Sequence, residues 1–243
     1  MNIKKHIPNL ITLINLFCGC IAVVFAFNQN VEMAFFFVAL GIFFDFFDGF
    51  FARLFNVTSP LGLQLDSLAD MVTSGVVPGT IMLFMLTNAL NIDVSNFEIT
   101  NVNFWFALCG YIITLGSCFR LANFNIDTRQ TDSFIGLPTP ANALFILSLP
   151  LILKNTDSLI ILGLLTDKWF LLVITLFSAY ILNAEIPLFA LKIKNFSFQK
   201  YKLQIGFVLF SVVLIVMLQF LAIPLIIISY VLLSVVNNML AKK

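Results

Sequence analysis

The chain has 243 residues, of which 60% are hydrophobic and only 10% are charged, and its formal net charge at pH 7 is +1. This composition excludes a soluble globular protein, and a net charge so close to zero argues against a nucleic-acid partner. Apolar runs of about 20 residues recur along the chain, and each is long enough to cross a hydrocarbon core of about 30 Å. We therefore predict an all-α, polytopic membrane helix bundle, built as a single domain over residues 1–243.

Eight apolar spans are expected, and they cover about residues 10–27, 31–54, 67–88, 104–123, 139–153, 169–190, 204–220 and 223–240. Lysines precede the first span, as they would in a signal peptide. The apolar run nevertheless continues to Phe27 without a small-x-small cleavage site in register, so a retained first helix is expected. The fifth span is short, and residues 157–166 either extend it or form an interfacial segment.

The positions of lysine and arginine test this order of spans. With a cytoplasmic N-terminus, 11 of the 13 basic residues fall inside and 2 fall outside. The inside set is Lys4, Lys5, Arg53, Arg120, Arg129, Lys192, Lys194, Lys200, Lys202, Lys242 and Lys243, and the outside set is Lys154 and Lys168. Because basic residues concentrate on the cytoplasmic side, we expect both termini inside and a location in the inner cell membrane.

The chain has few residues that could support histidine or cysteine chemistry. His6 is the only histidine, and no histidine cluster accompanies the four cysteines. The cysteines all lie inside apolar runs, where a role as small packing residues is expected.

Four aspartates gather where the second span ends and the third begins. Asp45 and Asp48 are three residues apart. Asp66 and Asp70 are four residues apart, so each pair shares one face of a helix. If residues 55–65 form the connecting turn, the two pairs face each other across an antiparallel helix pair. Asp66 and Asp70 are expected to open the third span, where the helix dipole would stabilise their charges by about 0.3–1 kcal/mol.

Such a cluster needs a compensating cation. A lone carboxylate in the bilayer costs about 2.5–3.5 kcal/mol, and converging carboxylates repel one another. Two Mg²⁺ or Mn²⁺ ions about 3.5–4 Å apart would neutralise the cluster and would also hold a pyrophosphate. The alternative is a set of structural charges, with Asp45 or Asp48 paired to Arg53, but one arginine cannot match four carboxylates. The spacing therefore favours a metal site for phosphoryl chemistry.

The residues between the aspartates fit a phosphate ligand. Gly49 and Ala52 remove side chains from one helix, which lets a ligand approach the backbone. Arg53 supplies a planar cation for phosphate. Ser59 belongs to a short polar turn, and Gly62 leaves room at the start of the next helix.

This segment resembles the signature of the CDP-alcohol phosphatidyltransferase family, because every position of D-x2-D-G-x2-A-R-x8-G-x3-D-x3-D is filled between residues 45 and 70. The family transfers a phosphatidyl group from a CDP-linked lipid to an alcohol and releases CMP. The resemblance implies that Asp45, Asp48 and Asp66 hold two metal ions, and that Asp70 touches metal and accepts the proton. It also implies a CDP site formed by Gly49, Ala52, Arg53, Ser59 and Gly62.

The N-terminal stretch narrows the choice within the family. Residues 7–20, IPNLITLINLFCGC, look like the opening helix of the bacterial and archaeal phosphatidylserine synthases. That likeness implies that Pro8, Asn9 and Thr12 contact the nucleotide, and an asparagine can both donate to and accept from a cytosine edge or a ribose. The alternative is that Pro8 and Asn9 only start a helix at the membrane interface.

Residues 119–142 are similar to the R-L-A-R-F-N … F-x-G-L-P-x-P-A segment of the same synthases, with Asn123 where many relatives carry arginine. A guanidinium can hold the carboxylate of free serine through two hydrogen bonds. The candidate serine contacts are Arg120, Asn123, Asn125 and Arg129. The alternative for the two arginines is positive-inside topology with contact to lipid phosphate. The sequence from Gly136 to Pro140 is interpreted as a rigid turn before the fifth span.

The resemblance implies transfer of a phosphatidyl group from CDP-diacylglycerol to L-serine at the cytoplasmic face, by a homodimer surrounded by membrane lipids. Two acceptors of the same family, glycerol phosphate and inositol phosphate, remain alternatives. A cation-coupled transporter would also use buried carboxylates, but its site would be expected near the midplane of the membrane. A non-catalytic scaffold would gain nothing from four clustered charges.

Overall fold

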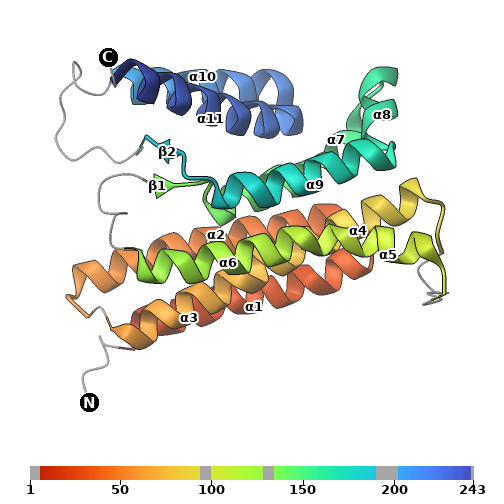
Figure 1. The fold of residues 1–243 in the computed structure, drawn as a ribbon. Coiled ribbons are helices and arrows are strands. Elements are labelled where there is room, and N and C mark those ends of the chain that lie inside the picture. Colours follow the sequence, from red (N-terminus) through yellow and green to blue (C-terminus); the bar gives the residue numbers. More distant parts are fainter. Residues whose placement is uncertain (1–5, 58, 94–99, 128–133, 190–201, 242–243) are drawn as a thin grey trace.

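The computed structural model describes residues 6–57, 59–93, 100–127, 134–189 and 202–241, and most of these lie in helices (Figure 1). The helices are α1 (Ile7–Phe27), α2 (Val31–Leu54), α3 (Pro60–Asp70), α4 (Val77–Ala89), α5 (Val102–Leu108), α6 (Ile112–Ile126), α7 (Thr139–Asn155), α8 (Leu159–Leu165), α9 (Lys168–Asn183), α10 (Lys202–Leu218) and α11 (Ala222–Ala241). A π-helical turn, Met71–Val76, joins α3 to α4. Two 3₁₀ turns, Cys109–Tyr111 and Gln219–Leu221, join α5 to α6 and α10 to α11. The predicted helical class is confirmed.

Within the described residues, five stretches are long and apolar enough to cross a membrane, namely Ile7–Phe27, Val31–Leu54, Pro60–Ala89, Val102–Ile126 and Lys202–Leu240. The pair α8 and α9 makes a sixth if it is counted as one span bent by 68°. Helix α7 has 17 residues and α9 has 16, which is fewer than the roughly 20 of a typical crossing. Helix length therefore does not establish the predicted number of eight crossings.

The third span begins earlier than predicted. The Ser59 hydroxyl accepts a hydrogen bond from the Gly62 N–H at 3.0 Å, and Pro60 is the first helical residue. A serine N-cap followed by proline is a strong helix start. Asp66 and Asp70 consequently lie beyond the first turn of α3, where the helix dipole no longer acts. The prediction that these two aspartates open the helix and are stabilised by its dipole is wrong.

Residues 157–166 do not extend the fifth span. The backbone becomes extended at Thr156 (φ −107°, ψ 138°), directly after α7. Helix α8 then follows as a separate element and meets α9 at 68°. The first of the two alternatives for this segment is therefore excluded, and its location at the membrane interface stays a prediction.

A two-residue β-pair interrupts the helical pattern, and the sequence did not predict it. Strand β1 (Phe134–Ile135) lies antiparallel to β2 (Pro187–Leu188). Gly136 follows with φ +75°, and a Cβ at this position would lie 2.4 Å from the Leu182 carbonyl oxygen. Only glycine fits such a turn. The Leu137 N–H donates to the Ile181 carbonyl and so joins the start of α7 to the end of α9. The interpretation of 136–140 as a turn is confirmed for residues 136–138 only, because α7 begins at Thr139.

In Figure 1, α1 to α6 lie on one side, α7 and α9 lie in the middle, and the α10–α11 hairpin lies on the opposite side, while α8 projects from the ends of α7 and α9. Helix α1 packs along α2. Small buried residues, including Ala22, Ala26 and Ala34, allow the close approach of these two backbones. The core is completed by α4 and α7, so α7 separates α1 to α6 from the C-terminal hairpin.

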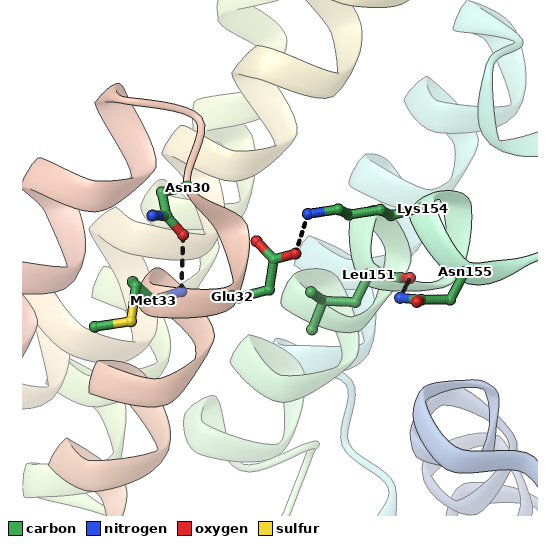
Figure 2. Close-up of polar contacts among 6 residues, drawn as sticks. All are labelled: Asn30, Glu32, Met33, Leu151, Lys154 and Asn155. Carbon is green, nitrogen blue, oxygen red and sulfur yellow. Dashed lines mark hydrogen bonds and ion pairs between the residues drawn. The ribbon is translucent and has the colours of Figure 1, made fainter.

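An ion pair connects the N-terminal end of α2 to the C-terminal end of α7. The Asn30 side chain caps α2, and the Lys154 ammonium group donates to the Glu32 carboxylate (Figure 2). Asp45 and Asp48 occupy the opposite end of α2. Helix α7 therefore begins on the side of the bundle that carries the aspartates and ends on the other side.

Replacing Lys154 by Ala is expected to change the free energy of unfolding by less than about 1 kcal/mol, because exposed ion pairs are screened by solvent. The Lys154 and Glu32 side chains are 67% and 48% exposed. The measurement is the thermal unfolding midpoint of the wild type and of Lys154→Ala in detergent, at low and at high salt. A large loss of stability that persisted in high salt would contradict this expectation.

Candidate active site

Three carboxylates converge between α2 and α3. One oxygen each from Asp45, Asp48 and Asp66 lies within 4.8 Å of the other two. A set of carboxylate oxygens is the ligand type that Mg²⁺ and Mn²⁺ prefer. The cluster therefore fits a divalent cation, which would offset the mutual repulsion of the three groups.

A cavity of about 510 Å³ borders this cluster, between α1, α2 and the start of α3. It is lined by Pro8, Asn9, Thr12, Asp48, Gly49, Ala52, Val57, Ser59, Pro60, Gly62, Leu63 and Asp66. Seven of the eight residues that the sequence assigned to the CDP site are in this lining. The cavity has the volume of a small-molecule site, and its small residues keep the walls close to the backbone.

Arg53 is the eighth of those residues, and it does not line the cavity. Its exposed side chain folds back along α2, where Nη1 lies 3.6 Å from the position that a Cβ on Gly49 would take. Because Gly49 is part of the lining, the guanidinium lies at the rim. A long, flexible side chain in that position can reach an anionic ligand.

Helix α1 contributes a hydroxyl group to the carboxylate cluster. Thr12 Oγ1 donates a hydrogen bond to Asp48 Oδ2 at 2.5 Å. Hydrogen bonds to an ionised acceptor are short and comparatively strong. The contact therefore fixes the orientation of Asp48 at the edge of the cavity.

Asp70 is not one of the three residues whose oxygens meet within 4.8 Å, but its carboxylate interacts electrostatically with Asp45, Asp48 and Asp66. Its Oδ1 accepts a hydrogen bond from Asn15 Nδ2 at 3.2 Å, and Asn15 Oδ1 in turn accepts from Thr73 Oγ1 at 2.9 Å. Arg120 is the cation that interacts with Asp70. Asp70 is buried at the end of α3, where the π-helical turn begins. Such π turns are frequent at functional sites.

Asn15 and Thr73 were missed by the sequence reasoning, although a signal for Asn15 was present. Pro8, Thr12, Asn15 and Gly19 follow one another at intervals of four, three and four residues. This period places them on one face of α1, and all four are buried in the structure. Polar residues at helical spacing in an apolar helix indicate a polar face, which here carries the partner of Asp70.

The contact between α1 and the π-helical turn depends on glycine. A Cβ on Gly19 would lie 2.5 Å from Thr73 Oγ1 and 3.1 Å from the Thr73 Cα. On α2, a Cβ on Gly41 would lie 2.8 Å from Asn15 Oδ1. The hydrogen-bonded chain from Thr73 through Asn15 to Asp70 is therefore enclosed by two positions that have no room for a side chain.

Replacing Gly19 by Ala is expected to destabilise the protein by about 1–3 kcal/mol and to lower its activity, because the added methyl group overpacks the contact with Thr73. The matched control is Gly206→Ala on α10, where a Cβ meets nothing within 4 Å. The measurements are the unfolding midpoint and the catalytic rate of both variants. Equal behaviour of Gly19→Ala and Gly206→Ala would contradict the proposed packing role.

The four candidate serine contacts have different surroundings. Arg120 is 7% exposed, its guanidinium carbon lies 5.8 Å from the centroid of the Phe124 ring, and its Nε has no hydrogen-bond partner among the described residues. Asn125 exchanges hydrogen bonds with Ser67 of α3 at 2.9 and 3.1 Å. Asn123 is exposed. The structure therefore brings Arg120 to Asp70 and joins Asn125 to α3.

Arg129, the fourth candidate, lies outside the described residues, as do seven of the residues used in the positive-inside count: Lys4, Lys5, Lys192, Lys194, Lys200, Lys242 and Lys243. The serine assignments remain predictions.

Comparison with known proteins finds several relatives that share one name. The chain is similar to the CDP-diacylglycerol–serine O-phosphatidyltransferase of Bacillus subtilis, with 35% identity over 136 residues, or 56% of this chain and 70% of that protein. Proteins of the same name from Helicobacter pylori and Saccharomyces cerevisiae are 37% and 34% identical over 142 and 160 residues. These matches cover 57% and 59% of this chain, but only 54% and 53% of the relatives' own lengths.

The family model for CDP-alcohol phosphatidyltransferases matches residues 5–180, which include α1 to α8 and most of α9. This range contains all four aspartates and every residue that lines the cavity between α1, α2 and α3. By this match, the chain belongs to the CDP-alcohol phosphatidyltransferase family.

Proposed function

We propose that this protein is an enzyme that transfers a phosphatidyl group from CDP-diacylglycerol to L-serine, producing phosphatidylserine and CMP. The main observation in support is the cavity of about 510 Å³ whose wall includes two of the three converging carboxylates. The names of the relatives from three organisms support serine as the acceptor.

Asp45, Asp48 and Asp66 are the proposed ligands for two divalent ions, Mg²⁺ or Mn²⁺. When bound, these ions would neutralise the carboxylates and the pyrophosphate of the CDP-lipid. Asp70 was predicted both to touch metal and to accept a proton. Both roles are kept in this proposal, because Asp70 interacts electrostatically with Asp45, Asp48 and Asp66.

The residues of the chain then have distinct tasks. The cavity holds the cytidine nucleotide, with Asn9 offering both a donor and an acceptor. Asp70 takes the proton from the serine hydroxyl, and the serine oxygen bonds to the phosphorus that carries the diacylglycerol. The bond from that phosphorus to the departing oxygen of CMP breaks. Arg53, at the rim, stabilises the negative charge of CMP, and Arg120, beside Asp70, is proposed to hold the serine carboxylate.

The membrane arrangement is part of the same proposal. We propose a single domain over residues 1–243 with eight crossings, both termini in the cytoplasm and the cavity facing the cytoplasm in the inner membrane. The distribution of basic residues in the sequence supports this orientation. The α10–α11 hairpin, which turns at Gln219 with φ +49°, supports two crossings at the C-terminal end. A homodimer is the expected assembly.

The decisive experiment supplies purified protein with CDP-diacylglycerol, Mg²⁺ or Mn²⁺, and one labelled acceptor at a time: serine, glycerol phosphate or inositol phosphate. CMP release and label in the lipid fraction are measured together. We expect both with serine alone. Activity with another acceptor would overturn the serine assignment within the family. Cation uptake into liposomes without CMP release would overturn the enzyme assignment.

A further inference from the structure

A second cavity, of about 610 Å³, lies between α7, α8, α9 and α11. Its lining shares no residue with the cavity at the aspartates. Apart from Asn142 and Ser178, every lining residue is apolar. A large apolar cavity with a few polar groups is the usual form of a ligand site.

Asn142, one of the two polar residues that line this cavity, has a side-chain N–H group without an acceptor among the described residues. Asn142 is 1% exposed, and its Oδ1 accepts a hydrogen bond from Ser178 Oγ at 2.5 Å. Its Nδ2 has no hydrogen-bond partner among the described residues. A buried donor without an acceptor costs about 1–3 kcal/mol. The site is therefore suited to a ligand with an oxygen acceptor beside an apolar body.

The shape of the cavity is that of a groove along the helices. Its lining on α7 runs from Asn142 to Ile152, a rise of about 15 Å and thus about half of a hydrocarbon core of about 30 Å. Asn142 lies near the start of α7, which is the end on the aspartate side of the bundle. The cavity is thus polar at one end and apolar along its length.

The groove is reachable from the side of the bundle. Phe177 of α9 and Ile228 and Leu232 of α11 line it and are themselves 55%, 46% and 60% exposed. In a membrane, such apolar side chains meet acyl chains rather than water. A lipid chain can therefore enter the groove without crossing a polar surface.

We propose that this cavity holds one acyl chain of a membrane glycerolipid, with its ester carbonyl accepting a hydrogen bond from Asn142 Nδ2. The lipid is resident and distinct from the CDP-lipid that reacts, because the lining of this cavity shares no residue with the cavity at the aspartates. Ala143, Ile146 and Leu147 of α7, which do not line the second cavity, are buried in the main core. The lipid fills the space between α7 and α9 and the C-terminal hairpin, so it helps to attach that hairpin. This inference does not depend on the proposed reaction.

The test uses the full chain in vesicles of phosphatidylethanolamine and phosphatidylglycerol that contain a phosphatidylcholine with a photoactivatable diazirine in its acyl chain. After illumination, labelled peptides are mapped by mass spectrometry, and phospholipid retained by the purified protein is measured. We expect label on cavity-lining residues of α7 and α9 and retained phospholipid. Label confined to residues outside the cavity would overturn the proposal.

Two variants and one control variant test the proposal further. Ile228→Trp fills the groove and is expected to remove most of the label on α7, whereas Val236→Trp, on an exposed position of α11 outside the cavity, leaves it unchanged. Asn142→Leu removes the donor at similar volume and is expected to lower phospholipid retention about fivefold, as the loss of one hydrogen bond predicts. Wild-type labelling and retention in Asn142→Leu would overturn the proposal, even if Ile228→Trp failed to fold.

A competition arm separates the resident lipid from the substrate. Excess CDP-diacylglycerol without a photoactivatable group is added before illumination. Unchanged label on α7 and α9 supports a separate lipid site. Loss of that label in proportion to CDP-diacylglycerol would assign the cavity to the reacting lipid and overturn the proposal as stated.

Discussion

Replacing Asp70 by Asn is expected to lower the rate of CMP release by about 10²–10⁴-fold while leaving CDP binding nearly unchanged, which is the effect of removing a general base. An amide cannot take the proton of the serine hydroxyl, but its oxygen can still accept the hydrogen bond from Asn15 Nδ2, which is 3.2 Å from Asp70 Oδ1. The cavity between α1, α2 and α3, where we propose that the nucleotide binds, is not lined by Asp70. The two measurements are the turnover number and the affinity for CDP in the presence of Mg²⁺.

The matched control for this variant is Asp167→Asn, the same chemical change at a distant site. Asp167 caps α9 by accepting from the Phe170 N–H at 2.8 Å, and asparagine is an equally good cap. We expect this control to keep wild-type activity. A turnover number close to that of the wild type in Asp70→Asn would refute the role of Asp70 as proton acceptor.

Replacing Asp48 by Ala is expected to raise the Mg²⁺ or Mn²⁺ concentration needed for half-maximal activity by at least about tenfold, because the effect of losing a ligand should exceed that of losing a supporting contact. The affinity for CDP is expected to fall together with the affinity for metal, since Asp48 belongs both to the carboxylate cluster and to the cavity wall. A second readout is thermal stability. Metal should raise the unfolding midpoint of the wild type more than that of the variant, because only binding to the folded state stabilises it.

Two controls accompany Asp48→Ala. Asp157→Ala removes an exposed carboxylate next to α8 and should leave the metal titration unchanged. Thr12→Val removes the hydroxyl that donates to Asp48 Oδ2 at 2.5 Å and should shift the titration less than Asp48→Ala does. An Asp48→Ala protein with the metal titration of the wild type would count against Asp48 as a ligand.

Much of the helical order was predictable because apolar runs and helix start signals are local. The second span, residues 31–54, was predicted with the bounds that α2 has. The start of α3 was missed by seven residues, since the prediction followed hydropathy and gave too little weight to the Ser59–Pro60 start. The β1–β2 pair was missed because its two strands are only two residues each and lie more than 50 residues apart in the chain.

The candidate site was likewise predictable only in part. The spacing of Asp45, Asp48 and Asp66 indicated that they share a site, and the structure brings their oxygens within 4.8 Å. The spacing also grouped Asp70 with them, and in the structure Asp70 interacts electrostatically with these aspartates while it accepts a hydrogen bond from Asn15, 55 residues earlier in the chain. The spacing along α1 marks Asn15 as part of a polar face, but it does not indicate that Asn15 pairs with Asp70, because this pairing depends on how α1 packs against the π-helical turn.

The sequence by itself determined that this protein is helical and membrane-like, and it determined which residues carry the family motif. These properties follow from composition, from the 3.6-residue period and from spacing along one chain segment. The tertiary structure alone decided the partners of Asp70, the bend between α8 and α9, and the apolar cavity lined by α7, α8, α9 and α11. In that cavity, Asn142 Nδ2 has no acceptor among the residues that the structure describes. The physical reason is that apolar helix faces contact lipid and protein equally well, so their lateral neighbours are set by packing between distant segments.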